Sequence, residues 1–283
     1  MRIYLAGACI NDDDLLEVDV VKAFLSGDWD GTEMYLQQPP GYVKPNYKAC
    51  QVLRPLEGTK QASNLWMVGN NKSIKSFGFE QCATEPNIWR KVTANGVIQL
   101  AVYVDNVIIR YPRGRRDLAD KEFVKPYGAR YNIKILGEPS ILLGIEITRD
   151  RAAHTHTLTI KQGLYIEKIF SKFCSARTTK DFSVPVHQAG TDAFHAMQLG
   201  DEADRLALGH RNLLELLGSL LWATATHPEI DFYVSWLCQF MSAPKVEHYD
   251  AGLAVLSYLY HSKEIGITYS ASRPDLEAFC DAS

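Results

Sequence analysis

The sequence lacks the features that mark several classes of protein. Its six cysteines are scattered, with no CxxC pair to hold zinc and no dense spacing to cross-link a small secreted domain. A reducing compartment is therefore the simpler expectation. The cysteines are Cys9, Cys50, Cys82, Cys174, Cys238 and Cys280.

Long hydrophobic runs are also lacking. Residues 1–10 have no basic region, long apolar run or small-residue cleavage site, so no secretory signal is expected. The most apolar stretch, residues 206–226, is interrupted by His210, Arg211 and Glu215, which would be costly inside a bilayer. We expect no membrane span.

There is little excess of charge of either sign. The chain carries 30 basic and 33 acidic residues, for a net charge of −3, which neither indicates nor excludes a nucleic-acid partner, because a local basic channel can coexist with a neutral total. The 283 residues are 46% hydrophobic and 22% charged. Such a composition is typical of a globular protein with one large or two modest domains.

The first half of the chain mixes strand-like and helical patterns. Leu15–Val20 is a short apolar run with turn-forming residues on both sides, which predicts a buried strand. Residues 60–77 have a weakly helical pattern that ends at Gly78, a residue suited to stop a helix.

Two hairpins are predicted. The β-rich runs 97–104 and 107–111 flank Asp105-Asn106 and predict a hairpin with polar residues at its tip. The runs 142–148 and 155–160, joined through a charged turn at residues 149–151, predict a second one.

The character of the sequence changes after about residue 176. Residues 178–200 are polar and irregular. Helical signals follow, in which Pro228 opens one helix and Pro244 precedes another that runs to Tyr260. The first of these helices has leucines spaced three and four residues apart, typical of core packing: Leu213, Leu214, Leu216, Leu217, Leu220 and Leu221.

Two aspartates carry the chemical signal. Asp19 lies at the end of the first predicted strand, and Asp105 lies at the tip of the first hairpin. Two-metal nucleotidyl transfer requires carboxylates on adjacent strands, so that two Mg²⁺ ions can sit about 3.5–4 Å apart. Either aspartate alone is a weak signal, because a single aspartate in a turn is ordinarily a turn-former.

The residues around these aspartates resemble the reverse transcriptases of Ty1/copia-type retrotransposons. The similarity to the first polymerase motif covers residues 17–28, EVDVVKAFLSGD, and 34–42, MYLQQPPGY. Residues 53–66, LRPLEGTKQASNLW, resemble the second motif, and Tyr103-Val104-Asp105-Asn106 takes the place of the Y-V-D-D box. Similarity continues in short segments through nearly the whole chain, at residues 136–138, 143–147, 218–221, 227–230, 240–244, 248 and 258–259. The last residues, FCDAS, resemble the first strand of a ribonuclease H domain.

The resemblance implies an α+β fold with the right-hand architecture of polymerases. Residues 1–175 would form the palm with part of the fingers, and residues 176–270 a helical thumb or connection region. Residues 271–283 would begin a ribonuclease H domain, with Asp281 as its first metal-binding carboxylate. Only residues 1–14 precede the first motif, so the chain is expected to be a fragment that lacks the N-terminal fingers.

The resemblance also implies roles for individual residues. Asp19 and Asp105, with the backbone carbonyl of Val20, would bind two Mg²⁺ ions. Phe24 would lie under the sugar of the incoming nucleotide and exclude a 2′-hydroxyl, although a core aromatic is an equally good interpretation of that residue alone. Gln61 and Tyr103 would contact the substrate.

Several positions depart from the family pattern. Asn106 replaces the second aspartate of the box and brings no negative charge to the metals. In the second motif, Glu57, Thr59, Ser63 and Asn64 stand where the family has Tyr, Leu, Pro and Arg.

The expected function follows from the resemblance and from these departures. It is RNA-directed DNA synthesis from deoxynucleoside triphosphates on a primed RNA or DNA template. The departures are expected to weaken or abolish this activity. The alternatives are a catalytically dead nucleic-acid-binding remnant and an inert pseudogene product. The family suggests cytoplasmic particles or the nucleus as the location.

Other features have two interpretations each. His154 and His156 share a strand face and would suit a metal, but a surface hairpin is favoured because no third ligand is near. A basic cluster is compatible with phosphate contacts or with a solvated loop: Arg110, Arg113, Arg115 and Arg116. Four tryptophans are expected in the core rather than as base-stacking platforms: Trp66, Trp89, Trp222 and Trp236.

Overall fold

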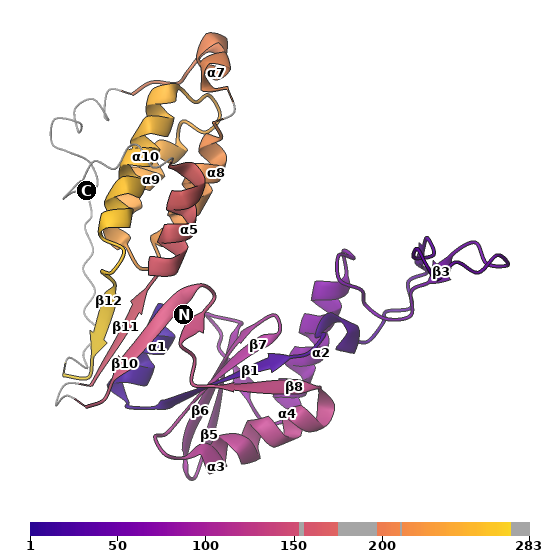
Figure 1. Cartoon of the computed structure of the whole chain (residues 1–283). Helices are drawn as coiled ribbons and strands as arrows, with labels where there is room; N and C mark the ends of the chain where they lie inside the picture. Colours follow the sequence, from indigo (N-terminus) through magenta and orange to yellow (C-terminus); the bar gives the residue numbers. More distant parts are fainter. Residues whose placement is uncertain (153–155, 175–196, 210, 273–283) are drawn as a thin grey trace. The chain divides into compact units, whose positions relative to one another are not determined.

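The computed structural model describes residues 1–152, 156–174, 197–209 and 211–272, which form a mixed α and β structure (Figure 1). The chain divides into two compact units. Of the described residues, the first unit (unit 1) comprises Met1–Pro139 with Ala271 and Ser272, and the second (unit 2) lies within Ser140–Ser270. The division differs from the boundary expected near residue 175, because the second predicted hairpin pairs with a strand at Ile267–Ser270. The assignment of these parts as polymerase subdomains stays a prediction.

A six-stranded antiparallel sheet forms the centre of unit 1. The strand order is β4-β5-β6-β7-β1-β8, so β1 is hydrogen-bonded to β7 on one side and to β8 on the other. The predicted first strand and first hairpin are confirmed. The strands are β1 (Asp14–Val20), β4 (Glu80–Gln81), β5 (Ile88–Thr93), β6 (Gly96–Tyr103), β7 (Asn106–Tyr111) and β8 (Ile133–Gly137).

The main core of unit 1 lies between this sheet and its helices. Alternate residues of β1, such as Val18 and Val20, are buried together with Trp66, Phe123 and Tyr127 from the helices. The helix predicted at residues 60–77 is confirmed as α2, whereas the other helices were not predicted. The helical elements are α1 (Arg2–Ile10), η1 (Phe24–Ser26), α2 (Ala62–Ser76), α3 (Arg116–Ala119), η2 (Asp120–Val124) and α4 (Lys125–Arg130).

Helix α1 is fixed to the sheet by its tyrosine. The Tyr4 hydroxyl lies 3.0 Å from the carbonyl oxygen of Gln99 in β6 and 2.9 Å from that of Ile108 in β7. Burial raises the pKa of this hydroxyl. The buried, neutral Tyr4 hydroxyl therefore attaches α1 to the sheet through two hydrogen bonds, whereas the other buried residues of this helix are apolar.

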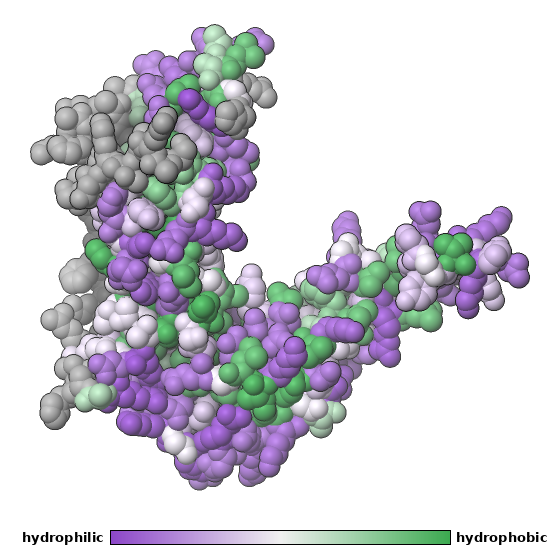
Figure 2. Space-filling model, in the orientation of Figure 1, coloured by the Kyte–Doolittle hydropathy of each residue, from purple (hydrophilic) through white to green (hydrophobic). Residues whose placement is uncertain are grey.

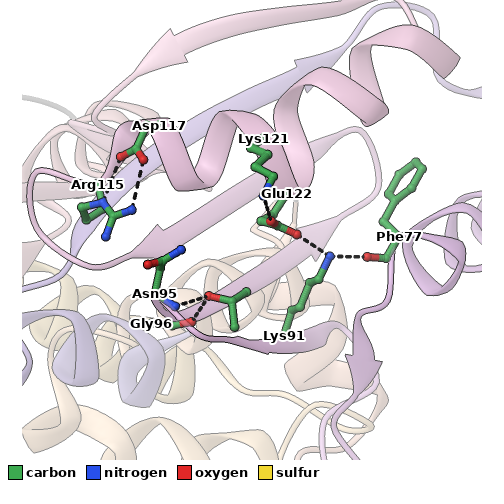
Figure 3. Close-up of polar contacts among 9 residues, drawn as sticks. Phe77, Lys91, Asn95, Gly96, Arg115, Asp117, Lys121 and Glu122 are labelled. Atoms are coloured by element: carbon green, nitrogen blue, oxygen red, sulfur yellow. Dashed lines mark hydrogen bonds and ion pairs between the residues drawn. The ribbon is translucent and has the colours of Figure 1, made fainter.

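A half-buried ion pair joins three elements of unit 1. The Lys91 ammonium of β5 donates to the carbonyl oxygen of Phe77 at 2.6 Å and lies 2.6 Å from Oε2 of Glu122 in η2 (Figure 3). The bond from Lys91 lowers the pKa of the Glu122 carboxyl below its ordinary value. This arrangement ties the end of α2 and the η2 helix to strand β5 of the sheet.

Unit 2 combines a four-stranded sheet with helices. The sheet order is β12-β11-β10-β9, and β10 pairs with β11 as the predicted second hairpin. Its strands are β9 (Ile141–Leu142), β10 (Ile145–Asp150), β11 (Thr157–Lys161) and β12 (Ile267–Ser270). Its helices are α5 (Gly163–Phe173), α7 (Glu202–Leu208), α8 (Leu213–Ala223), η3 (Pro228–Ile230), α9 (Asp231–Cys238) and α10 (Val246–His261).

The prediction that leucines of α8 pack in the core is confirmed, whereas the prediction that Trp222 is buried is wrong. Leu213, Leu216, Leu217 and Leu220 are buried, whereas Leu214 and Leu221 are exposed. Trp66 and Trp89 are buried as predicted, but Trp222 is 41% exposed, because it lies two residues past Leu220 on the opposite side of the helix.

Some predictions fall on residues that are not described. The irregular stretch up to residue 196, His154 and Asp281 lie outside the described residues. Among the described helices, none is long and apolar enough to cross a membrane.

We predict that Glu122→Gln destabilises the protein by about 1 kcal/mol at pH 7. Because the folded pKa of Glu122 is depressed, its contribution is present above the ordinary value of 4.5 and is lost as the pH falls through the lowered folded value. Urea unfolding over a pH series therefore should show the difference from wild type shrinking in acid. Glu80→Gln, at an exposed position of the same sheet, is the control. A difference that stays constant in acid would contradict the prediction.

Candidate active site

The two predicted aspartates are brought together by the pairing of β1 with β7. Asp19 lies directly opposite Asn106 in the antiparallel register. The backbone N–H of Val20 donates to the carbonyl oxygen of Asp105 at 2.9 Å. Residues directly opposite each other in an antiparallel pair point to the same face, so Asp19 and Asn106 share one face of the sheet, next to the hairpin tip that carries Asp105.

The hairpin tip is backbone-strained. Tyr103 pairs with Asn106, which leaves Val104 and Asp105 as a two-residue turn. Val104 has φ +54°, a left-handed conformation that costs a β-branched residue roughly 1–3 kcal/mol. Two hydrogen bonds hold the tip in this shape: Trp66 Nε1 donates to the Val104 carbonyl at 2.6 Å, and Val20 donates to Asp105.

A row of four side chains crosses the sheet at this level. Tyr103 of β6 is opposite Asn106 of β7, Asn106 is opposite Asp19 of β1, and Asp19 is opposite Lys134 of β8. Lys134 therefore brings a positive charge beside Asp19, at an exposed position. No sequence pattern pointed to this lysine, because β8 was not predicted as a strand.

Further negative charge lies along the same strand. Glu17 precedes Asp19 by two residues, so both side chains face the same side of β1. Partial burial, followed by the negative charge of Asp19, raises the pKa of the Glu17 carboxyl. Among the described residues, no group of three His, Cys, Asp or Glu side chains could hold a metal ion.

The available donors are nevertheless of the right kind for magnesium. Asp19 and Asp105 offer carboxylate oxygens, and the neighbouring backbone offers carbonyl oxygens. Mg²⁺ prefers hard oxygen ligands and usually takes only one or two protein carboxylates, with water and substrate phosphates completing its shell. Two aspartates therefore fit a magnesium site that substrate oxygens complete.

A pocket of about 420 Å³ lies beside Asp105. Phe24 lines it together with Lys22, Val104 and Glu57. Phe24 is also partly buried against the main core of unit 1, so the core interpretation and the substrate interpretation of this residue both fit. The charged side chains in the lining are one cation and two anions: Lys22, Glu57 and Asp105.

The other two predicted substrate residues lie apart from Phe24. Tyr103 is 53% exposed and lines a separate pocket of about 150 Å³ together with Trp66. Val104 lines both this pocket and the one beside Asp105. Gln61 is half-buried at the start of α2, and its carbonyl accepts a hydrogen bond from the N–H of Leu65 at 2.9 Å. Gln61 lines neither of these pockets.

The positive charges of the basic cluster are neutralised by aspartates of the same unit. Each of its arginines forms an ion pair with an aspartate, one of which is visible in Figure 3. The pairs are Arg110–Asp13 at 2.6 Å, Arg113–Asp12 at 2.6 Å, Arg115–Asp117 at 3.0 Å and Arg116–Asp120 at 2.7 Å. This pairing favours the structural interpretation over phosphate contacts.

His156 also has a partner within its own hairpin. Its Nε2 atom accepts a hydrogen bond from Nε of Arg149 at 2.8 Å, across the β10–β11 pair. The contact is consistent with the surface-hairpin interpretation.

Two aspartates thus lie where adjacent antiparallel strands meet, beside a pocket that Phe24 lines. Comparison with known families shows to which one the chain belongs. A model of the family described as reverse transcriptase (RNA-dependent DNA polymerase) matches residues 1–187. The chain belongs to this family.

Curated relatives narrow the family to retrotransposons. The chain is 29% identical over 277 residues to a transposon Ty5-1 protein of Saccharomyces cerevisiae, covering 94% of this chain and 83% of that protein. It is 26% identical over its full length to the retrovirus-related Pol polyproteins of transposon TNT 1-94 from Nicotiana tabacum and of transposon RE2 from Arabidopsis thaliana. It spans 21% and 18% of those polyproteins. The resemblance to copia-type elements is confirmed.

We predict that Trp66→Phe loosens the hairpin tip. Phenylalanine keeps most of the buried ring but cannot donate to the Val104 carbonyl, which costs about 1–2 kcal/mol. The Val20 amide, which donates to Asp105, should then exchange its hydrogen faster in a hydrogen-exchange measurement.

Trp89→Phe is the matched control for this change. Trp89 is as buried as Trp66, at 2% exposure, but its Nε1 has no hydrogen-bond partner among the described residues. If both variants speed exchange at Val20 equally, the Trp66 hydrogen bond does not hold the tip.

Proposed function

We propose that this chain carries the palm and part of the fingers of a reverse transcriptase in unit 1, and a helical thumb or connection region in unit 2. The site on β1 and the β6–β7 hairpin would extend a DNA primer on an RNA or DNA template. The observation that carries the proposal is the β1–β7 register, which joins Asp19 to the hairpin tip of Asp105. The family match supports it.

In this proposal Asp19 and Asp105, with the backbone carbonyl of Val20, hold two Mg²⁺ ions. Bound there, the ions would supply Lewis-acid activation of the primer hydroxyl and positive charge for the triphosphate. The protein's own contribution is to fix the two carboxylates. The Trp66 and Val20 hydrogen bonds hold Asp105 in place, and the buried alternation of β1 fixes Asp19.

The pocket beside Asp105 would take the incoming nucleotide. Phe24 in its lining offers a flat apolar surface to the sugar, where an added 2′-hydroxyl would be desolvated without a partner. Lys22 lines the same pocket and offers one positive charge to the phosphates. Gln61 and Tyr103 are proposed to contact the nucleotide and template from outside this pocket.

Asn106 would weaken this site. An amide oxygen coordinates Mg²⁺ without contributing negative charge, and Asn106 stands directly opposite Asp19. Glu57 in the pocket lining repels phosphate, and Lys134 beside Asp19 reduces the negative potential that attracts cations. These observations favour a second candidate, a nucleic-acid-binding remnant without polymerase activity.

We predict Mg²⁺-dependent primer extension on a homopolymer template. Asp19→Ala should reduce the rate by about 10²–10³-fold, because a metal-site charge stabilises the transition state by several kcal/mol. Asp250→Asn, at an exposed position of α10, should leave the rate unchanged. Salt-dependent template binding without extension would instead support the remnant, and neither activity would support the pseudogene product.

Asn106→Asp should raise the extension rate at least about tenfold, because it restores one unit of negative charge beside Asp19. Asn106→Ala removes the amide oxygen and should lower the rate below that of wild type. Both rates are measured at saturating Mg²⁺ and nucleotide. If the aspartate variant gives no gain, the missing charge is not the chief defect of the site.

A further inference from the structure

The segment that carries β2 (Tyr35–Leu36) and β3 (Cys50–Gln51) has an unusual charge balance. Residues 34–56, here called the β2–β3 segment, contain Lys44, Lys48 and Arg54 and no aspartate or glutamate. In a chain with net charge −3, this stretch has a formal charge of +3. Such a local excess of positive charge suits an anionic partner.

Large aromatic side chains on this segment face solvent. Tyr42 is 79% exposed, Tyr47 65% and Tyr35 56%. In Figure 2 hydrophilic and hydrophobic residues are interspersed over the surface of this segment. Single exposed aromatics are common, but three on one short basic segment form a set of flat surfaces interleaved with cations.

The segment has a defined backbone despite its exposure. Tyr35 pairs with Gln51 and Leu36 with Cys50. Its loop is closed by Gln38, whose side-chain oxygen accepts from the N–H of Lys44 at 2.7 Å and whose amide donates to the carbonyl oxygens of Lys44 and Tyr47. The tyrosines are thus presented from a closed loop, which lowers the entropy lost on binding.

The cations of the segment are available, in contrast to the arginine cluster. Among the described residues, which include the whole β2–β3 segment, Lys44, Lys48 and Arg54 form no ion pair, whereas all four arginines of the cluster after the first hairpin do. The segment ends at Leu56, which lines the pocket beside Asp105. It therefore leads directly to the candidate active site.

We infer that the β2–β3 segment binds single-stranded nucleic acid, with Tyr42 and Tyr47 stacking on unpaired bases and Lys44, Lys48 and Arg54 contacting the phosphates. Exposed rings stack only on bases that are not already paired, so the surface suits a single strand and not a duplex. That this strand is the unpaired template rests on the proposed function. The binding itself needs no catalysis.

The test is fluorescence anisotropy of a labelled oligodeoxythymidylate with the full chain. Tyr42→Ala and Tyr47→Ala should each weaken binding roughly 5- to 150-fold, the loss expected for one stacked base. Tyr42→Trp should retain wild-type affinity. The Lys44→Gln/Lys48→Gln double variant should reduce the slope of log affinity against log salt by about 1.4, or about 0.7 per lost phosphate contact on a single strand.

Phe232→Ala provides the matched control. Phe232 of α9 is 56% exposed, like Tyr35, but lies in unit 2. Its loss should leave the affinity for the oligonucleotide unchanged. An equal loss of affinity in Phe232→Ala and Tyr42→Ala would overturn the inference, because binding would then not depend on this surface.

The outcomes separate this inference from the proposed function. Asp19→Ala should bind the single strand as tightly as wild type while losing extension. If the tyrosine variants bind as well as wild type, or wild type does not bind at all, the inference is overturned whatever the extension assay shows. If they change self-association in sedimentation and leave oligonucleotide binding intact, the surface is a protein interface and the inference is likewise overturned.

Discussion

The antiparallel pairing of β1 with β7 is the constraint on which the site depends. A slip of one residue would turn every side chain of β1 to the other face. Leu16, Val18 and Val20 would then leave the core, and Glu17 and Asp19 would be buried in it. The loss of three buried apolar side chains and the burial of two carboxylates both oppose the slip. Core packing therefore fixes the position of Asp19 without any contact that is specific to function.

The same core supports the strained turn at the hairpin tip. Val104 adopts a conformation that its side chain disfavours, and the bond from Trp66 stabilises it. Trp66 is itself buried against Tyr131, with ring centroids 5.1 Å apart. The position of Asp105 thus depends on a chain of contacts that runs from α2 through the indole to the turn. A substitution far from the carboxylates can disturb them through this chain.

Local sequence patterns predicted the strand and the hairpin that carry Asp19 and Asp105. The features that these patterns did not predict depend on contacts between residues far apart in the chain. The short apolar run of residues 15–20 with its flanking turn residues was sufficient to predict β1, and the polar tip between two β-rich runs was sufficient to predict the β6–β7 hairpin. Lys134 was missed because its importance arises only from the pairing of β8 with β1. The role of the arginine cluster stayed open because Arg110 and Arg113 pair with Asp13 and Asp12, which lie 97 and 101 residues earlier in the chain.

Basic side chains that have no carboxylate partner determine where the phosphates of a nucleic acid would be attracted near this site. The arginines nearest the hairpin are compensated by carboxylates, so a phosphate would have to displace an existing ion pair to reach them. Lys22 in the pocket faces Glu57 and Asp105 in the same lining. The uncompensated cations of the β2–β3 segment meet no such competition. These cations would therefore contribute favourable electrostatic energy to the proposed binding of a nucleic acid, whereas the carboxylates of β1 and the hairpin tip would repel its phosphates.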